Sequence, residues 1–329
     1  MPEPKLKFAL IGCGYIGKRY IQLLEQHPGC ELVALIDTDS NRLSEFKNSN
    51  IPVFLSTETY FTSGIHADAA IVATPNDTHA AIAISCLKQN KHVLIEKPMA
   101  LSKADAEAII ETAKEQDKKA MVVLQNRFSP VSVWLKEMIA SKKLGAIFFI
   151  QVNCFWNRDE RYYKKDSWHG TKEMDGGSLF TQFSHFVDTI YWLFGNVKNI
   201  SSRFHNFNHT ALTGFEDTGA IHFELEQGGM GCMNFTTAAW DKSFESSLTV
   251  IAKKGNIKVS GQYMDRIEYC HVKDYEPPVE INKATAPANH HVKMVDAFVE
   301  AVKTGGNANA KEALYSIDII ERMYAGSHS

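Results

Sequence analysis

The chain has 329 residues, a formal net charge of −3 and a hydrophobic fraction of 44%. Single hydrophobic cores stop growing near roughly 250 residues, so this length predicts two domains. The balance of charge provides no basic surface for nucleic acid or an anionic membrane, and no apolar run approaches the roughly 20 residues that span a bilayer. The expected partner is therefore a small molecule.

Six cysteines are spread along the chain, and none belongs to a Cys-x-x-Cys pair. Several interrupt apolar segments, which is typical of buried thiols in a reducing compartment and not of a disulfide framework or a zinc site. The N-terminus runs into a predicted strand without the apolar core of a signal peptide. We therefore expect a cytoplasmic protein without a bound metal.

Residues 1–124 alternate short apolar runs with helical patterns. The runs lack polar alternation, which is typical of parallel strands covered on both faces. Strands are expected at 8–11, 31–36, 69–73, 93–95 and 121–124, and helices at 16–27, 40–47, 78–89 and 102–116. Strand–helix repetition predicts an α/β domain of the Rossmann type, with a doubly wound parallel sheet.

Residues 125–329 follow a different pattern. Apolar and polar residues alternate at 150–154, 221–225 and 233–236, as in strands with one buried face. A helix is expected over 178–194 with Gly195 at its end, followed by closing helices at 292–302 and 314–323. The second domain is thus predicted to be α+β with a mostly antiparallel sheet, and its last residues, 290–329, are candidates for packing back on the first domain.

The segment from Trp156 to Asp175 is expected to be a long irregular loop. Loops of that length inside a compact domain are often functional.

A glycine loop, Gly12-Cys13-Gly14-Tyr15-Ile16-Gly17, joins the first strand to the first helix. Its glycines permit a tight turn and a close approach of the backbone to a pyrophosphate at the helix N-terminus. The alternative is a glycine-rich turn without a ligand, which the position between strand and helix disfavours. The loop therefore predicts a dinucleotide site.

Asp37 closes the second predicted strand. A carboxylate at this position accepts hydrogen bonds from the adenosine ribose and repels a 2′-phosphate, which favours NAD over NADP. Arg42 is the counterargument, because a nearby arginine can accommodate that phosphate.

Two further segments lie at the carboxyl ends of predicted strands, where open α/β sheets bind ligands. The first is Thr74-Pro75-Asn76 with His79, which also fits an ordinary helix cap. The second is Glu96-Lys97-Pro98, in which the Lys97 ammonium can orient a hydroxyl and stabilise charge as hydride leaves a carbon. Its alternative is a solvated Glu–Lys pair ahead of a turn.

Together these motifs resemble the Gfo/Idh/MocA oxidoreductase family. The resemblance extends to Gly176-Gly177, His185-x-x-Asp188 and a closing helix over 310–324. It implies a Rossmann domain, then an α+β domain whose large open sheet often mediates oligomerisation, so a homodimer or homotetramer is expected. It also implies NAD-dependent oxidation of a CH–OH group, in which Lys97 positions the hydroxyl and His185 accepts its proton, with further cofactor contacts from Gln125 and Trp168.

Family members often carry an aspartate four residues before this histidine, where Thr181 stands here. A hydroxyl cannot replace the carboxylate of a proton relay, which leaves Lys97 and His185 as the expected acid–base pair. On one continuous helix Thr181, His185 and Asp188 would share a face, and Asp188 would either orient His185 or support packing. The alternative for His185 is a core histidine, and for Trp168 a core anchor.

Thr181-Gln182, Gln125–Phe128 and Trp168–Thr171 resemble the branch of this family that oxidises C3 of UDP-N-acetylglucosaminuronic acid. Such an anionic substrate needs cations, and arginine suits bidentate recognition of carboxylate or diphosphate. The expected substrate contacts are Arg127, Arg158, Arg161, Tyr163, Thr181, Gln182 and His185. The alternative is a solvated, nearly neutral loop.

Three other functions stay open at this point. The first is the same oxidation on a free sugar or an inositol. The second is a glycosidase of the same family that uses NAD transiently. The third is a non-catalytic dinucleotide-binding regulator, against which the presence of both Lys97 and His185 counts.

Overall fold

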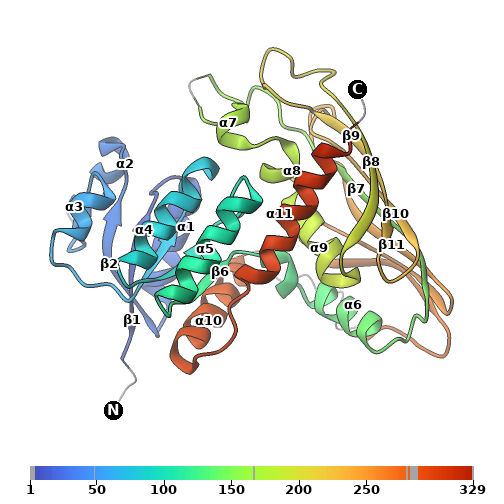
Figure 1. Ribbon diagram of the computed structural model, residues 1–329, viewed down its shortest axis with the longest axis horizontal. Coiled ribbons are helices and arrows are strands. Elements are labelled where there is room, and N and C mark those ends of the chain that lie inside the picture. The colour runs from blue at the N-terminus through green and yellow to red at the C-terminus, as the bar shows by residue number, and fades with distance from the viewer. Residues whose placement is uncertain (1–3, 48, 166, 279–280, 282–287, 328–329) are drawn as a thin grey trace. The chain divides into compact units, whose positions relative to one another are not determined.

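The computed structural model describes residues 4–47, 49–165, 167–278, 281 and 288–327 (Figure 1). The chain divides into two compact units, of which the first comprises residues 1–123 and 294–314 and the second residues 124–293 and 315–329. The chain passes between the units within helices α10 (Ala288–Thr304) and α11 (Ala310–Ala325).

The first unit contains a six-stranded sheet in the order β3-β2-β1-β4-β5-β6, and all its pairings are parallel. The strands are β1 (Leu6–Ile11), β2 (Cys30–Ile36), β3 (Val53–Phe54), β4 (Ala69–Val72), β5 (His92–Ile95) and β6 (Ala120–Val122). The strand order reverses between β1 and β4, which is the switch point of a doubly wound sheet. The predicted α/β fold is confirmed.

Helices pack against this sheet. They are α1 (Tyr15–Gln26), α2 (Ser40–Ser44), α3 (Thr57–Phe61), 3-10 helix η1 (Asn76–Thr78), α4 (His79–Lys88) and α5 (Lys103–Glu115). Helix α2 ends at Ser44 and is shorter than the predicted 40–47. Its buried residue is Leu43. From α10, Phe298 brings its ring within 6.0 Å of Phe8 on β1.

The second unit contains a seven-stranded sheet in the order β13-β12-β11-β7-β10-β9-β8. Every neighbouring pair is antiparallel except β7 with β10, which confirms the predicted mostly antiparallel sheet. The strands are β7 (Ile147–Phe155), β8 (Val197–His205), β9 (Thr218–Leu225), β10 (Met230–Thr236), β11 (Glu245–Ala252), β12 (Gly255–Ser260) and β13 (Arg266–Val272).

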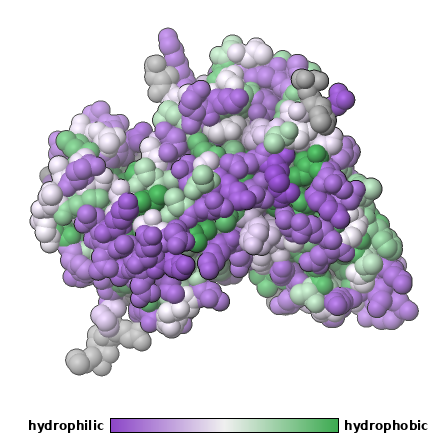
Figure 2. Space-filling model, in the orientation of Figure 1, coloured by the Kyte–Doolittle hydropathy of each residue, from purple (hydrophilic) through white to green (hydrophobic). Residues whose placement is uncertain are grey.

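The two faces of this sheet differ. Along β7, Ile150 and Val152 are buried, whereas Phe149 and Gln151, which alternate with them, are half-exposed. The helices of the unit lie on one side of the sheet in Figure 1. At the right-hand edge of Figure 2, where Figure 1 shows these strands nearly edge-on, hydrophobic and hydrophilic atoms are mixed.

The helices of the second unit differ from the prediction in one place. They are 3-10 helix η2 (Gln125–Phe128), α6 (Pro130–Ala140), α7 (Lys172–Asp175), α8 (Ser178–Thr181) and α9 (Ser184–Phe194). The single helix predicted over 178–194 is wrong, because the chain leaves helical geometry at Phe183. That ring is fully buried 5.2 Å from Trp156 and 5.0 Å from Phe235, and this packing draws the backbone out of the helix.

The structure also bears on membranes, thiols and metals. Of the described helices, none is both long and apolar enough to cross a membrane. All six cysteines are free thiols. Within the described ranges, no three His, Cys, Asp or Glu side chains gather as metal ligands would.

Candidate active site

The glycine loop brings β1 and β4 into close contact. Gly12 has a φ of +95°, and a Cβ on it would lie 2.3 Å from the carbonyl oxygen of Ala73. Helix α1 then begins after Gly14, with no capping side chain and no acidic residue in its first turn. Its first N–H groups are therefore open to an anion, which fits the pyrophosphate of a dinucleotide.

Asp37 is buried beside this loop. Its Oδ2 accepts a hydrogen bond from the Cys13 N–H and its Oδ1 one from the Asp39 N–H, both at 2.8 Å. Oδ2 also accepts a long hydrogen bond of 3.5 Å from Arg42 Nη1, so Oδ1 is the oxygen with a lone pair to which a ribose hydroxyl can bond. Arg42 lies 3.5 Å from both Asp37 and Asp39, so two carboxylates compensate its charge. Burial, and next the Asp37 charge, raise the pKa of Cys13 to about 12 and keep that thiol protonated.

His79 joins the two loops that end β4 and β5. Its Nδ1 lies 2.7 Å from the carbonyl oxygen of Pro98 and its Nε2 lies 2.9 Å from that of Thr74. Burial lowers the pKa of His79, and the two carbonyl contacts act against that shift. In its neutral form the ring has one N–H and donates to one of the two oxygens. The sequence predicted that His79 contacts the cofactor. It did not predict that His79 lies between the carbonyl oxygens of the two loops.

Glu96 anchors the tripeptide that contains Lys97. Its Oε1 accepts a hydrogen bond of 2.7 Å from the Tyr20 hydroxyl of α1, and its Oε2 one of 3.1 Å from the Lys97 N–H. Burial, and next the Glu96 charge, raise the pKa of Tyr20, which keeps the phenol protonated as the donor. The solvated Glu–Lys pair is therefore wrong for Glu96, which is buried, while Lys97 is half-buried.

Asp188 on α9 is bound by two other segments of the second unit. Arg127 donates two hydrogen bonds to its carboxylate, at 2.9 and 2.7 Å, and Ser316 donates a third at 2.9 Å. The side chains of Arg127 and Asp188 are 9% and 2% exposed. Through Asp188, Arg127 fastens η2 and Ser316 fastens α11 to the helix that carries His185. The side chain of His185 is also buried.

A carboxylate does lie beside Thr181. The Thr181 hydroxyl lies 2.6 Å from Oδ1 of Asp175 and 2.7 Å from its carbonyl oxygen, and donates toward both. Gly170 N–H donates to the other carboxylate oxygen, and Asp175 is fully buried. Reasoning from sequence missed Asp175, since only the turn through Gly176 and Gly177, with φ of +82° and +109°, carries it back to Thr181.

The long loop contains a chain of hydrogen bonds with a fixed direction. Arg158 Nε donates to Gln182 Oε1 at 2.8 Å, and Gln182 Nε2 donates to the Tyr162 hydroxyl at 2.8 Å. Arginine has only donors, so this contact fixes which way the Gln182 amide points. The Tyr162 oxygen also lies 3.3 Å from Nδ1 of His169.

The other predicted site residues of the second unit lie in different environments. Arg161 forms ion pairs with Asp159 and Asp241. Tyr163 is buried against His209 and Phe215, so its ring is a packing element and not an open stacking surface. Trp168 is half-buried with its ring 3.8 Å from that of His169, and Gln125 is buried in η2.

Two family models match the chain. The oxidoreductase family with an NAD-binding Rossmann fold, GFO/IDH/MocA, matches residues 6–124, and the GFO/IDH/MocA C-terminal domain matches residues 133–258. The chain belongs to the GFO/IDH/MocA oxidoreductase family, as its motifs predicted. It is an NAD-dependent dehydrogenase acting on a CH–OH group.

Particular relatives within the family are also similar to this chain. The WlbA dehydrogenase of Chromobacterium violaceum, solved with NADH and UDP-GlcNAcA, is 29% identical with a TM-score of 0.89 over 99% of this chain and 94% of its own. WlbA of Bordetella pertussis, solved with the same two molecules, is 29% identical with a TM-score of 0.88 over 98% and 96%. The inositol 2-dehydrogenase of Rubrobacter xylanophilus is 24% identical over 78% of this chain and 71% of its own.

Proposed function

We propose that this enzyme oxidises a secondary hydroxyl of a nucleotide sugar, namely the hydroxyl at C3 of a UDP-N-acetylglucosaminuronate-like substrate. One observation carries the proposal. Over 99% of its length the chain is similar, at 29% identity and a TM-score of 0.89, to a dehydrogenase solved with NADH and UDP-GlcNAcA. The cofactor, NAD, supplies the acceptor for the hydride when it is bound.

The proposed chemistry divides between two side chains. Lys97 orients the reacting hydroxyl and stabilises the charge that develops on its oxygen. His185 accepts the hydroxyl proton as general base. The buried anchor of Glu96 supports this role for Lys97, because it holds the Lys97 backbone N–H.

Thr181 takes part as an acceptor. The Thr181 hydroxyl donates toward Asp175, and a hydroxyl oxygen that donates can also accept a hydrogen bond, here from a substrate hydroxyl. Asp175 acts through Thr181 and is therefore a positioning residue. Gln182 contributes to the same site by holding Arg158.

The proposed cofactor contacts extend from the glycine loop to the strand ends. Asp37 bonds the ribose hydroxyls, and its pairing with Arg42 supports NAD over NADP. The remaining proposed contacts are Gly12, Gly14, Tyr15, Ile16, Gly17, Thr74, Asn76, Gln125 and Trp168.

The proposal includes a homo-oligomer, dimer or tetramer, in the cytoplasm. Support for assembly comes from the face of the large sheet that carries half-exposed Phe149 and Phe155 along β7. Six free thiols support a reducing compartment.

A substrate panel followed by NADH absorbance tests this function. The panel contains UDP-N-acetylglucosaminuronate, UDP-N-acetylglucosamine, glucuronate and myo-inositol, each with NAD and with NADP. We expect NADH formation with the first compound and weaker formation, or none, with the others. Turnover of inositol alone would replace the proposed substrate by a polyol. Release of a sugar from a glycoside added to the panel, without net NADH, would indicate a glycosidase. No reduced cofactor even with a stoichiometric amount of enzyme would indicate a regulator.

A further inference from the structure

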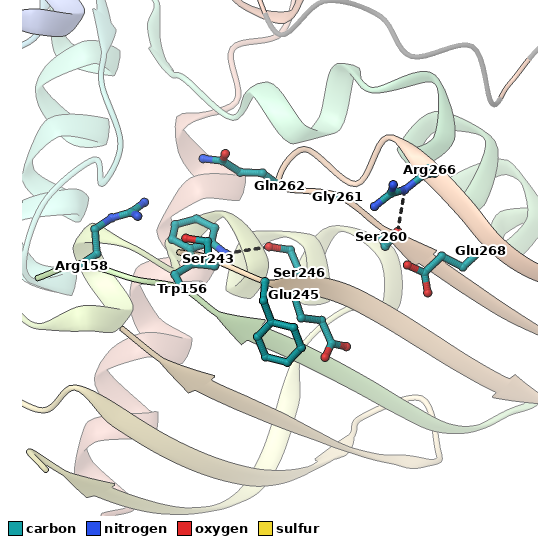
Figure 3. A pocket seen from close by; sticks show the side chains of 11 residues that line it. Trp156, Arg158, Ser243, Glu245, Ser246, Ser260, Gly261, Gln262, Arg266 and Glu268 are labelled. Atoms are coloured by element: carbon teal, nitrogen blue, oxygen red, sulfur yellow. Dashed lines mark hydrogen bonds between the residues drawn. The ribbon is translucent and has the colours of Figure 1, made fainter. Parts of the chain in front are cut away.

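The second unit contains a cavity of about 310 Å³ at the ends of β7, β11 and β12 (Figure 3). Trp156 and Arg158 come from the segment after β7, Ser243 and Phe244 from the segment before β11, and Gln262 from the turn between β12 and β13. Its volume is at the lower end of the range for small-molecule sites, roughly 300–1,000 Å³.

Arg158 is a half-buried cation in this wall. Its Nε donates to Gln182 and its Nη1 to the Asn157 carbonyl oxygen, at 2.8 and 2.7 Å. Its guanidinium carbon lies 4.8 Å from the ring centroid of Trp156 and 5.1 Å from that of Tyr162. Of the residues with described positions, no carboxylate lies within ion-pair distance of it. Burial lowers the pKa of Arg158, as is expected for a cation partly withdrawn from water.

The wall also contains two carboxylates, neither of which is paired with Arg158. Glu245 keeps its negative charge, because its hydrogen bonds come from the neutral side chains of Asn153 and Ser247, at 3.3 and 2.6 Å. Glu268 is paired with Lys258 at 3.0 Å. Arg266, held by Ser260, adds a second guanidinium, and Figure 3 shows Arg158 and Arg266 on opposite sides of the lining.

The wall also has a flat apolar surface. Phe244 is 72% exposed, and its ring is stacked on that of Phe155 with centroids 5.6 Å apart. An aromatic ring beside guanidinium groups is suited to a ligand that combines a ring with an oxyanion.

We propose that this cavity binds the phosphate oxygens of a nucleoside diphosphate group, with Arg158 as the principal cation and Phe244 as the surface beneath the attached ring. The inference rests on the proposed function and deepens it, because it assigns the part of the substrate remote from the oxidised carbon. Arginine N–H groups bond phosphate with both charge and direction. The hydrogen bond to Gln182 holds Arg158 in place before a ligand arrives.

Binding of UDP to the NADH-loaded enzyme, measured by calorimetry, tests this assignment. We expect the wild type to bind UDP and Arg158→Met to weaken the binding at least tenfold. Arg158→Lys, which keeps the charge without the planar fork, should fall between them and protects the test if the methionine variant folds poorly. Lys164→Met is the matched control, since Lys164 is an exposed cation of the same loop. It should bind UDP within a factor of two of the wild type.

Two further arms separate the possible ligands and the two proposals. Glucuronate, which carries a carboxylate and no phosphate, should not compete with UDP. UDP binding that is equal in the wild type and both Arg158 variants would overturn the assignment, as would competition by glucuronate that depends on Arg158. If a free sugar is oxidised while Arg158 has no effect on UDP, this inference fails and the dehydrogenase stands. If UDP binding depends on Arg158 but no sugar in the panel is oxidised, the cavity assignment stands and the proposed substrate fails.

Discussion

The side chains of the site owe their direction to partners that sequence patterns locate only in part. The motif residues Lys97 and His185 were recognisable because each belongs to a short motif beside a strand end or a glycine pair. Asp175 was not, since its role depends on two glycines in left-handed conformations. The different surroundings of Arg158 and Arg161 also could not be predicted, because both are arginines of one loop and only folding pairs one of them with Asp159.

Replacing either proposed catalytic residue should abolish turnover and spare the cofactor. We expect Lys97→Met and His185→Asn each to lower kcat by a factor of about 10²–10⁴, the range for removing a group that transfers or stabilises a proton. NAD binding, measured by fluorescence titration, should stay within a few-fold of the wild type. Near-wild-type turnover in both variants would refute the proposed chemistry.

Thr181 offers a finer test, because two substitutions separate its hydroxyl from its shape. Thr181→Val keeps the volume but removes the acceptor and leaves Asp175 without this donor. We expect kcat to fall about 10–100-fold, on the order of one lost charge-assisted hydrogen bond. Thr181→Ser should restore most of it. If the valine variant loses thermal stability but keeps its kcat, Thr181 has a structural role only.

At the scale of elements, the sequence predicted type and order better than boundaries. The apolar runs of the first unit are buried on both faces, so their pattern located five of its strands, while β3 with two residues is too short to leave a pattern. The pattern over 178–194 is helical on average, yet the burial of Phe183 divides it into α8 and α9. Burial in a particular aromatic cluster is a tertiary effect that local periodicity does not contain.

The turn into α8 should be sensitive to a single methyl group. Gly177 has a φ of +109°, and a Cβ there would lie 2.2 Å from the Tyr324 hydroxyl. That hydroxyl cannot yield easily, because it donates to Glu216 at 2.6 Å and accepts from the Leu179 N–H at 3.2 Å. We expect Gly177→Ala to cost about 2–5 kcal/mol, from the left-handed backbone and from overpacking together.

Gly228 supplies the matched control for this turn. Its φ is +99°, and no atom lies within 4 Å of the position of a Cβ. Gly228→Ala should therefore cost only the backbone term, about 1–2 kcal/mol. Urea unfolding of the two variants compares them directly, and equal losses would show that the contact with Tyr324 does not matter.

At the scale of the whole molecule, composition and pattern predicted the two fold classes, and motifs predicted the family. The division of the chain is less simple than a boundary at one residue, because residues 294–314 belong to the first unit. Amphipathic helices such as α10 show an apolar face but not which core it covers. Both family models match the chain, so the motifs and their spacing identified the family, which composition alone could not do.

Acidification should destabilise the protein between about pH 6.5 and pH 4. Burial lowers the pKa of four histidines, His79, His92, His209 and His290, and that of His92 to about 4. An unfolded histidine binds a proton near pH 6.5, before the folded protein does, so stability is lost as the pH falls through this window. Burial raises the pKa of Glu216, which acts with the opposite sign but as one group.

Thermal unfolding at pH 7.5 and pH 5 measures this effect. We expect a melting temperature several degrees lower at pH 5, and a smaller difference in His92→Gln. A melting temperature that is equal or higher at pH 5 would contradict the assignment of these histidines as buried and neutral.

The most direct test of the proposed oxidation follows the hydrogen that leaves the sugar. UDP-N-acetylglucosaminuronate with deuterium at C3 is mixed with a stoichiometric amount of enzyme and NAD, so that a single turnover is visible even if NADH stays bound. Mass spectrometry of the nicotinamide then reports where the hydride came from. We expect reduced cofactor that carries one deuterium, whereas unlabelled NADH, or no reduced cofactor at all, would contradict the proposed oxidation.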